Sequence, residues 1–340
     1  MIITAHSRRR YLKQAIESAL QQSPGIPYEI IVAKNFEDED IDAFMAQKGV
    51  ISVLCNEENV GEKLTAALRA SSGDIISFLD DDDLFYPEKL KVVVGQFMAH
   101  EELGFYHNGK VDIDSEGKPM TLRKGGGRQY AVGGTRFFFD PKARPSIRAL
   151  MTLNPGSNSS SISIRRESVF EHLEELRSIR AYPDAFIYAV SLARGVVLEY
   201  DSRPLTKYRV HTENTSSARV FMDMDEYMRG RRSILELVIQ DQRKILEVVE
   251  RVDRYAVATE LLRNSLAVFQ MSKHVNDGEN RALVLREYIR MLTAGHLLNY
   301  DVYSASLLSA RALSYALLPR RIAGKLRSLR AVQLYNRRKR

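Results

Sequence analysis

Residues 75–90 read IISFLDDDDLFYPEKL, and this stretch decides the fold. Its apolar first half is typical of a strand that is buried on both faces of a parallel sheet. The four aspartates Asp80 to Asp83 follow directly, so we expect them at the carboxyl end of that strand, where open α/β sheets hold their ligands. Pro87 then indicates the start of a helix, which we predict to run towards His100.

The acidic run favours a bound cation. Four adjacent carboxylates repel one another, so such a run is stable mainly where a divalent cation or solvent neutralises it. Magnesium and manganese prefer carboxylate oxygens and are usually shared with substrate phosphates, which indicates chemistry on a diphosphate. The alternative is a solvated acidic turn, and the strand before the run and the helix after it make that alternative less favoured.

Strand and helix patterns alternate on both sides of the acidic run. This alternation predicts βαβ units, and therefore a doubly wound, mostly parallel α/β sheet with helices on both faces. Beyond Phe221 the apolar spacing predicts an α-helical C-terminal region. The other predicted elements are, in chain order, strand 2–5, helix 12–20, strand 28–33, a short helix around 41–45, strand 51–54, helix 62–70 and extended segment 105–113. A cationic loop is predicted over 118–154, and it is either an active-site lid or a solvated excursion. Strand 157–164, helix 166–176 and a helix after Pro183 are predicted after it.

Composition bounds the class of protein. With 340 residues and 44% hydrophobic content, the chain can bury one large core, or one domain with an appendage. Its single cysteine, Cys55, excludes an intramolecular disulfide and any multi-cysteine metal site, which fits a reducing compartment. No signal peptide is expected after Met1, and no apolar run reaches the ~20 residues of a membrane-spanning helix. We therefore expect a soluble or peripheral protein, in the cytoplasm or at the cytoplasmic face of a membrane.

The net charge of +7 belongs to the end of the chain. Residues 302–340 hold ten Lys or Arg and no acid, whereas residues 1–301 hold 40 basic and 43 acidic residues. In this tail Ile322, Leu326 and Leu329 recur at helical spacing among cations, which favours contact with an anionic membrane surface. A solvated helix or a disordered end is the alternative. We expect no nucleic-acid partner, because the body is nearly neutral and the tail has few aromatic residues.

Five segments in the same order resemble inverting family 2 glycosyltransferases with the GT-A fold. They are IITAHSRRRYLKQAIESALQQ, YEIIVAKNF, ENVGEKLTAALRASSGDIISFLDDDDLFYPEKL, AYPDAFIY and LTKYRVHTENTS. The resemblance implies a GT-A-like nucleotide-sugar-binding and catalytic domain at 1–217. The helical region predicted from apolar spacing then covers 218–301, and the basic amphipathic tail covers 302–340. It also implies that a divalent cation, Mg²⁺ or Mn²⁺, assists inverting transfer of a hexose from a nucleoside-diphosphate sugar to an acceptor hydroxyl. Glycan or lipid-linked acceptors, in polysaccharide, glycolipid or glycoprotein-glycan synthesis, are the implied partners.

The resemblance also implies which residues hold the nucleotide. Thr4, His6 and Arg8 fall where the family contacts the base and the ribose. The family usually has paired aspartates after the second strand, and this chain has Lys34 and Asn35 there. The Asn35 amide still offers a donor and an acceptor to a base.

The diphosphate and the metal fall on later positions. By resemblance, Asp82 binds the metal directly and Asp80 reaches the metal through water or contacts the ribose, while Asp83 orients ligands or the acceptor. The register stays ambiguous because Asp81 and Asp83 have the same spacing.

Three further positions lie beside the diphosphate in the family. They imply that Lys63 neutralises a phosphate, that His211 is a further metal ligand and that Arg209 pairs with a phosphate. The alternatives are an exposed helix lysine at Lys63 and capping of a strand end by His211 and Arg209.

Asp184 matches the family's catalytic acid–base position at the start of a helix. By resemblance it takes the proton from the acceptor hydroxyl, and the alternative is a helix cap. The run NSSSIS at 158–163 implies a hydroxyl-rich wall for the sugar, or else a strand with an ordinary polar face.

Two other functions stay open. Sugar-phosphate nucleotidyltransfer uses a similar sheet, but here the first strand leads into AHSRRR and not into a glycine-rich phosphate loop. The other is a non-catalytic carbohydrate- or nucleic-acid-binding protein on a transferase scaffold.

Overall fold

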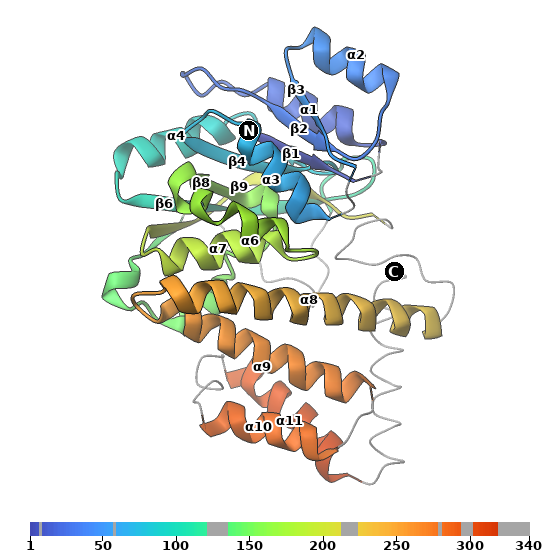
Figure 1. Ribbon diagram of the computed structural model, residues 1–340, viewed down its shortest axis with the longest axis vertical. Coiled ribbons are helices and arrows are strands. Elements are labelled where there is room, and N and C mark those ends of the chain that lie inside the picture. The colour runs from blue at the N-terminus through green and yellow to red at the C-terminus, as the bar shows by residue number, and fades with distance from the viewer. Residues whose placement is uncertain are drawn as a thin grey trace. The chain divides into compact units, whose positions relative to one another are not determined.

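The structure is a computed structural model that describes residues 1–6, 9–56, 59–120, 135–211, 224–277, 281–293 and 302–318. The chain divides into two compact units. The first unit comprises Met1–Pro145, Leu153–Val210 and Glu247–Ala258, and the second comprises Ser146–Thr152, His211–Leu246 and Thr259–Arg340. The elements of both are labelled in Figure 1.

The described part of the first unit is built on a nine-stranded sheet with the order β3-β2-β1-β4-β8-β6-β9-β5, and β7 pairs with β9 beside this path. The strands are β1 (Ile2–Ala5), β2 (Ile31–Lys34), β3 (Ile51–Leu54), β4 (Ile75–Asp80), β5 (Leu84–Phe85), β6 (Leu103–Ile113), β7 (Arg136–Phe139), β8 (Ile162–Arg165) and β9 (Val197–Arg209). The first four are parallel, β8 is antiparallel to both β4 and β6, and β6 is parallel to β9. The predicted doubly wound α/β class is confirmed.

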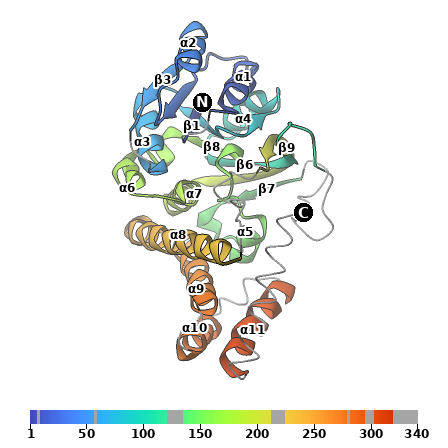
Figure 2. The same cartoon turned by 90° about the vertical axis from the view of Figure 1, so that its right-hand side faces the viewer.

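Helices cover both faces of the parallel half of the sheet. Ile3 and Ala5 of β1 belong to a buried cluster that includes residues of α1 and α2. Because side chains alternate along a strand, Ile2 and Thr4 point to the opposite face, and α3 packs along β1, β2 and β3. Figure 2 shows α1 and α3 on opposite sides of β1. The helices of this unit are α1 (Leu12–Leu20), α2 (Glu39–Gln47), α3 (Val60–Ala70), α4 (Lys89–Ala99), α6 (Leu173–Arg177) and α7 (Pro183–Ala193).

Three predicted elements are wrong in whole or in part. The predicted strand 157–164 begins only at β8, because Asn158 has φ +65° and Ser159–Ser161 form a 3₁₀ turn. The predicted helix 166–176 is broken into two 3₁₀ turns and the short α6, since Val169 has φ −134° and ψ −13° and ends the first turn. Of the predicted 118–154 loop, residues 121–134 lie outside the described residues. The described remainder contains β7 and α5 (Ile147–Leu153), so the prediction of a continuous loop is wrong there.

Strand β3 forms one edge of the sheet. Its side chains Ile51 and Leu54 are 41% and 47% exposed. Cys55 follows the strand, is half-buried, and donates its backbone N–H to the carbonyl of Lys34 at 2.8 Å. The cysteine therefore lies beside the carboxyl end of β2.

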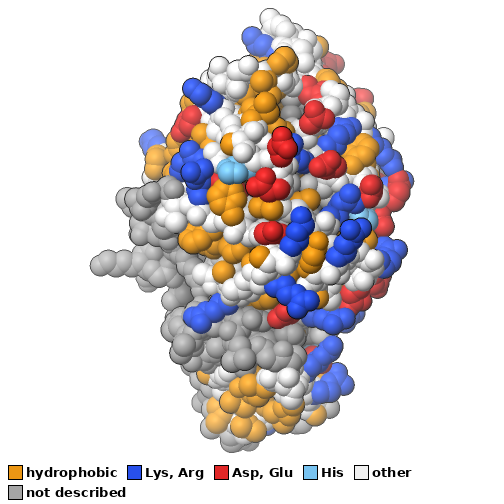
Figure 3. Space-filling model, turned by 90° about the vertical axis from the view of Figure 1, so that its left-hand side faces the viewer, with side chains coloured by type: hydrophobic (Ala, Val, Ile, Leu, Met, Phe, Trp, Pro, Cys, Tyr) orange, Lys and Arg blue, Asp and Glu red, His pale blue; other side chains and the backbone are white. Residues whose placement is uncertain are grey.

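The described part of the second unit is helical, as predicted. Its elements are α5 (Ile147–Leu153), α8 (Met224–Val252, which ends in the first unit), α9 (Val257–Asp277), α10 (Arg281–Thr293) and α11 (Val302–Leu317). A buried cluster that includes Met271, Val284 and Met291 joins α9, α10 and α11. Within the described ranges, no helix combines the length and apolar character needed to cross a membrane. On the side of the molecule in Figure 3, acidic and basic side chains are interspersed.

Candidate active site

The aspartate run forms the turn between β4 and β5. Asp80 ends β4 and lies opposite Thr4 in the parallel register with β1. The Asp83 backbone N–H donates to the Asp80 carbonyl at 3.2 Å and closes the turn. Asp80 is half-buried, whereas Asp81, Asp82 and Asp83 are only 2%, 6% and 0% exposed. The predicted position of the run at the carboxyl edge of the parallel strands is confirmed.

The fold itself engages two of these carboxylates. Asp81 Oδ2 accepts the backbone N–H of His6 at 3.1 Å, and Asp83 Oδ1 accepts that of Arg209 at 2.8 Å. The Arg209 Nε also donates to the carbonyl of Asp82 at 2.8 Å. Asp83, expected by resemblance to orient ligands, is therefore a buried anchor for β9.

Burial and mutual repulsion weaken the acidity of these groups. Burial, then the charges of Asp83, Asp82, Asp81 and Asp184, raise the pKa of Asp80 well above its ordinary value. Burial is also the largest cause that raises the pKa of Asp83 to about 7 and that of Asp184 to about 6. The buried Oδ2 of Asp83 has no hydrogen-bond donor within the described part of the chain. Acids whose ionisation is opposed in this way attract a cation, so the residues present fit a divalent ion.

The protein supplies only part of a metal's ligand shell here. Over the described ranges, no three His, Cys, Asp or Glu side chains form a group that could hold a metal ion. Magnesium usually takes one or two carboxylates and completes its shell with water and substrate phosphates. A cation at the aspartate turn would therefore need a bound diphosphate.

A buried polar network holds the aspartate turn in place. Ser160 Oγ accepts the backbone N–H of Asp80 at 3.0 Å, and the Ser160 carbonyl accepts the Thr206 hydroxyl at 2.7 Å and a donor from Lys89 Nζ. Ser160 and Lys89 are both fully buried. The implied sugar-facing wall at 158–163 is therefore wrong for Ser160, whose hydroxyl holds the aspartate turn.

Asp184 lies in the first turn of α7, directly after Pro183. Its Oδ1 accepts the backbone N–H of Ala185 at 2.9 Å, and its Oδ2 accepts that of Asn158 at 3.1 Å. The carboxylate thus stabilises the start of α7. Asp184 lies close to the aspartate turn, because Asn158 is two residues before Ser160, whose Oγ accepts the Asp80 N–H at 3.0 Å. The Asp184 charge also raises the pKa of Asp80.

The residues predicted to hold the nucleotide meet at the ends of β1 and β2. His6 Nδ1 lies 2.8 Å from Lys63 Nζ and 3.5 Å from the Asn35 amide nitrogen. An ammonium group can only donate, so Nδ1 is the acceptor and Nε2 carries the proton. Lys63 is 1% exposed, which rules out the alternative of an exposed helix lysine.

Arg209 makes structural contacts that the sequence did not predict. It is fully buried and donates to the carbonyls of Asp114 at 3.3 Å and Ser115 at 3.1 Å, in addition to that of Asp82. It also donates to Gln14 Oε1 at 2.9 Å. These bonds tie the aspartate turn to α1 and to the turn after β6, and the phosphate contact of Arg209 stays a prediction.

Two predicted residues lie at the margins of the described structure. His211 follows β9 and is half-buried. Arg8 lies outside the described residues. For both, the predicted contacts stay predictions.

A family model described as "Glycosyl transferase family 2" matches residues 1–173, which is half of the chain. The chain belongs to this family. The match covers β1, the aspartate turn and β8, and the predicted family is confirmed. Asp184 lies beyond the matched residues.

Curated relatives are glycosyltransferases of uncharacterised activity. An uncharacterized glycosyltransferase of Rickettsia bellii is 25% identical over 245 residues, which cover 71% of this chain and 32% of that protein. One from Haemophilus influenzae is 30% identical over 120 residues, 34% of this chain and 40% of that protein. The chain therefore spans less than half the length of these relatives.

Solved structures share the fold. S. aureus TarS has a TM-score of 0.54 at 12% identity, covering 92% of this chain and 52% of TarS. A TarS fragment, 1–349, in complex with UDP-GlcNAc has the same TM-score at 11% identity, covering 96% of this chain and 90% of the fragment. The predicted GT-A-type fold of the glycosyltransferase is thereby confirmed.

Lys110 was not among the predicted site residues. Lys110 lies on β6, half-buried, with Nζ 3.4 Å from the centroid of the Tyr208 ring. Burial lowers its pKa, while nearby carboxylates that include Asp83, Asp80 and Asp184 oppose this shift. Lys110 is therefore a cation of the aspartate site. The chain offers no local signal for it, because it reaches the site through the pairing of β6 with β9.

Proposed function

We propose that this glycosyltransferase is metal-dependent and inverting, and that it transfers a hexose from a nucleoside-diphosphate sugar to an acceptor hydroxyl. The acceptor would be a glycan or a lipid-linked glycan in polysaccharide, glycolipid or glycoprotein-glycan synthesis. One observation carries the proposal: Asp184 and Asp80 bond to the same short segment, since Asp184 Oδ2 accepts the Asn158 N–H at 3.1 Å and Ser160 Oγ accepts the Asp80 N–H at 3.0 Å. Holding a diphosphate through a cation and deprotonating an acceptor both require carboxylates, and both must act at one anomeric carbon.

The donor is proposed to lie across the carboxyl ends of β1, β2 and β4. Its base and ribose would contact Thr4, His6, Arg8 and Asn35, and Lys63 would offset charge on the diphosphate. The contact between Lys63 and His6 supports this, since it places an ammonium group beside the strand end that carries Thr4. The TarS complex with UDP-GlcNAc supports a nucleotide sugar as the donor.

Asp80 and Asp82 are the proposed ligands for Mg²⁺ or Mn²⁺, with His211 as a further ligand. The register is supported by the engagement of the Asp81 and Asp83 carboxylates with backbone N–H groups. When bound, the cation would stabilise the negative charge that grows on the departing nucleoside diphosphate.

Asp184 is the proposed base. It would accept the proton of the acceptor hydroxyl while the hydroxyl oxygen bonds to the anomeric carbon from the face opposite the diphosphate. The bond between that carbon and the diphosphate oxygen breaks in the same step. A pKa of about 6 leaves Asp184 mostly ionised at neutral pH and makes it a stronger base than an ordinary aspartate.

The test compares Asp184→Asn with a matched control, Asp38→Asn. Asp38 caps the start of α2 by accepting the Ile41 N–H and pairs with Arg9 at 3.3 Å, so its variant reports on the loss of a capping carboxylate outside the aspartate turn. With a panel of nucleotide sugars and Mn²⁺, we expect the wild type to release nucleoside diphosphate and not pyrophosphate. Asp184→Asn should lose about 10²–10⁴-fold in kcat, with donor affinity retained. Normal transfer by Asp184→Asn, or release of pyrophosphate, would refute the proposal.

The cytoplasmic location and the membrane contact also remain proposals. The basic tail after Pro319 lies outside the described residues, and its composition alone supports a peripheral contact with anionic lipid. A lipid-linked acceptor would account for such a contact.

A further inference from the structure

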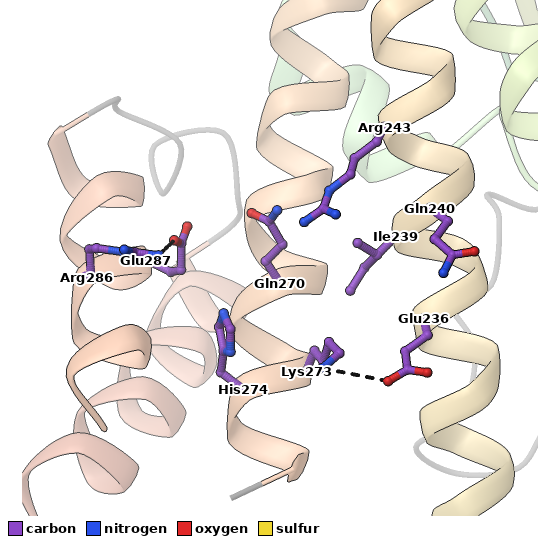
Figure 4. A pocket seen from close by; sticks show the side chains of 9 residues that line it. All are labelled: Glu236, Ile239, Gln240, Arg243, Gln270, Lys273, His274, Arg286 and Glu287. Carbon is purple, nitrogen blue, oxygen red and sulfur yellow. Dashed lines mark hydrogen bonds and ion pairs between the residues drawn. The ribbon is translucent and has the colours of Figure 1, made fainter. Parts of the chain in front are cut away.

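The second unit contains a cavity of about 500 Å³ between side chains of α8, α9 and α10 (Figure 4). This volume lies in the range of small-molecule sites. Most such sites are lined chiefly by apolar side chains, but here Ile239 is the one apolar residue of the lining and the rest are polar or charged. A wall of this kind selects a ligand that both donates and accepts hydrogen bonds.

Among the described residues, two of the cations that line the cavity pair with carboxylates of the lining, and a third does not. Lys273 pairs with Glu236 at 3.8 Å, and Arg286 pairs with Glu287 at 3.3 Å. Arg243 of α8 extends into the cavity towards α9, and it has no carboxylate partner within the described part of the chain (Figure 4). A guanidinium group without a counter-charge is suited to bind a carboxylate or a phosphate through two parallel hydrogen bonds.

On the α10 side of the cavity, a buried carboxylate oxygen lacks a hydrogen-bond donor among the described residues. Glu287 is only 5% exposed, and its Oε2 has no hydrogen-bond donor among the residues that the structure describes. Arg290 Nη1 lies 3.9 Å from this oxygen, which is too far for a hydrogen bond. A buried acceptor without a donor is costly, and a ligand hydroxyl would remove that cost. The amides of Gln240 and Gln270 add further donors and acceptors to the lining.

We propose that this cavity binds an acidic saccharide unit, with its carboxylate or phosphate on Arg243 and its hydroxyls on Glu287 and the two glutamines. A neutral sugar would leave Arg243 without a counter-charge, and a bare anion would leave Glu287 Oε2 without a donor. The residues of this site differ from those of the proposed donor site. The inference therefore goes beyond the proposed function and does not depend on it.

The test titrates the full chain with four probes and follows binding by calorimetry. Glucuronic acid and glucose 6-phosphate are the acidic probes, and methyl glucoside and inorganic phosphate are the neutral and bare-anion probes. We expect at least one acidic probe to bind about tenfold more tightly than both methyl glucoside and inorganic phosphate. The acidic probe that binds more tightly then identifies the acid group of the ligand. Arg243→Gln should abolish this preference. Arg263→Gln, an exposed change on α9 outside the lining, should leave it intact.

Two further variants keep the test decisive. Glu287→Ala should weaken glucose 6-phosphate binding without affecting that of inorganic phosphate, since only the sugar contacts Glu287. Asp82→Asn, which acts on the proposed donor site, should leave all four affinities unchanged, so that failure of the proposed function and failure of this inference are separable. Failure of both acidic probes to bind more tightly than methyl glucoside and inorganic phosphate, an unchanged preference in Arg243→Gln, or loss of binding in Asp82→Asn would overturn the inference.

Discussion

At the scale of single residues, the carboxyl group of Asp184 sets the pH dependence that we expect for transfer. Its pKa is about 6, and only the ionised form can accept a proton. We therefore predict that kcat/KM is level above about pH 7 and falls by about tenfold per pH unit well below pH 6. Initial rates over pH 4.5–8.5 at saturating Mn²⁺ measure this. A profile that stays level down to pH 5 would contradict the role of Asp184.

Asp83 provides a prediction about stability. Its pKa is about 7 in the folded protein and 3.8 ordinarily, so between these values the folded state binds more protons than the unfolded state. This contribution is fully present at pH values below about 4 and is lost as the pH rises through 7. Asp83→Asn keeps an oxygen acceptor for the Arg209 N–H and removes the titration.

We therefore expect the difference in free energy of unfolding between wild type and Asp83→Asn to move in favour of the variant between pH 4 and pH 8. Urea unfolding of both proteins at several pH values without divalent cation measures this difference. Parallel pH dependences of the two proteins would show that Asp83 is ionised throughout.

The sequence located the candidate residues but not the contacts that some of them make with distant partners. Asp80 follows from a strand end, and Asp184 was implied by the family resemblance. Lys63 contacts His6 from 57 positions away, and Arg209 donates to Asp82 across 127 positions. No local pattern encodes contacts of that kind, so the burial of Lys63 and the structural role of Arg209 required the structure.

At the scale of elements, close packing of α3 yields a prediction with its own control. A Cβ on Gly61 would lie 2.2 Å from the carbonyl oxygen of Leu176 and 2.4 Å from that of Ile179, both backbone atoms. Gly61→Ala should therefore destabilise the protein by about 2 kcal/mol or more, because the α3 backbone must move away. On α4, nothing lies within 4 Å of a Cβ on Gly95, so Gly95→Ala should stabilise the protein by about 0.5–1 kcal/mol. Chemical denaturation of both variants tests the contrast.

The elements with strong periodicity were predicted well. The predicted strands 2–5 and 51–54 and the helix 12–20 match β1, β3 and α1 residue for residue. The segment 157–161 was predicted wrongly because its hydroxyls, such as that of Ser160, bond across the fold instead of following a strand pattern. Local side-chain hydrogen bonds, such as those of Ser157 to the Asn154 carbonyl and of Asn158 to Ser161 Oγ, also compete with regular structure.

At the scale of the whole molecule, alternation of strands and helices was enough to predict the fold class. It did not predict that β8 would lie antiparallel between β4 and β6, because pairing between distant strands leaves no periodic signal. The near neutrality of residues 1–301 was equally visible in the sequence, and it concentrates any electrostatic attraction in the tail.

The tail therefore carries a prediction for the whole molecule. We expect the full chain to bind vesicles that contain phosphatidylserine, and binding to weaken as salt rises through about 0.1–0.5 M. Replacing the nine Lys and Arg after Pro319 by glutamine should abolish binding, at about 1 kcal/mol per charge near the surface. Co-sedimentation with anionic and with phosphatidylcholine vesicles measures this. Equal binding to both kinds of vesicle would contradict an electrostatic contact.

The single thiol of the chain lies where a spectroscopic reporter is useful. Cys55 is half-buried and bonds to Lys34, the residue before Asn35, through its backbone N–H. One maleimide fluorophore attached there would label a unique position without removal of competing cysteines. Its emission would then respond to events at the carboxyl ends of β2 and β3.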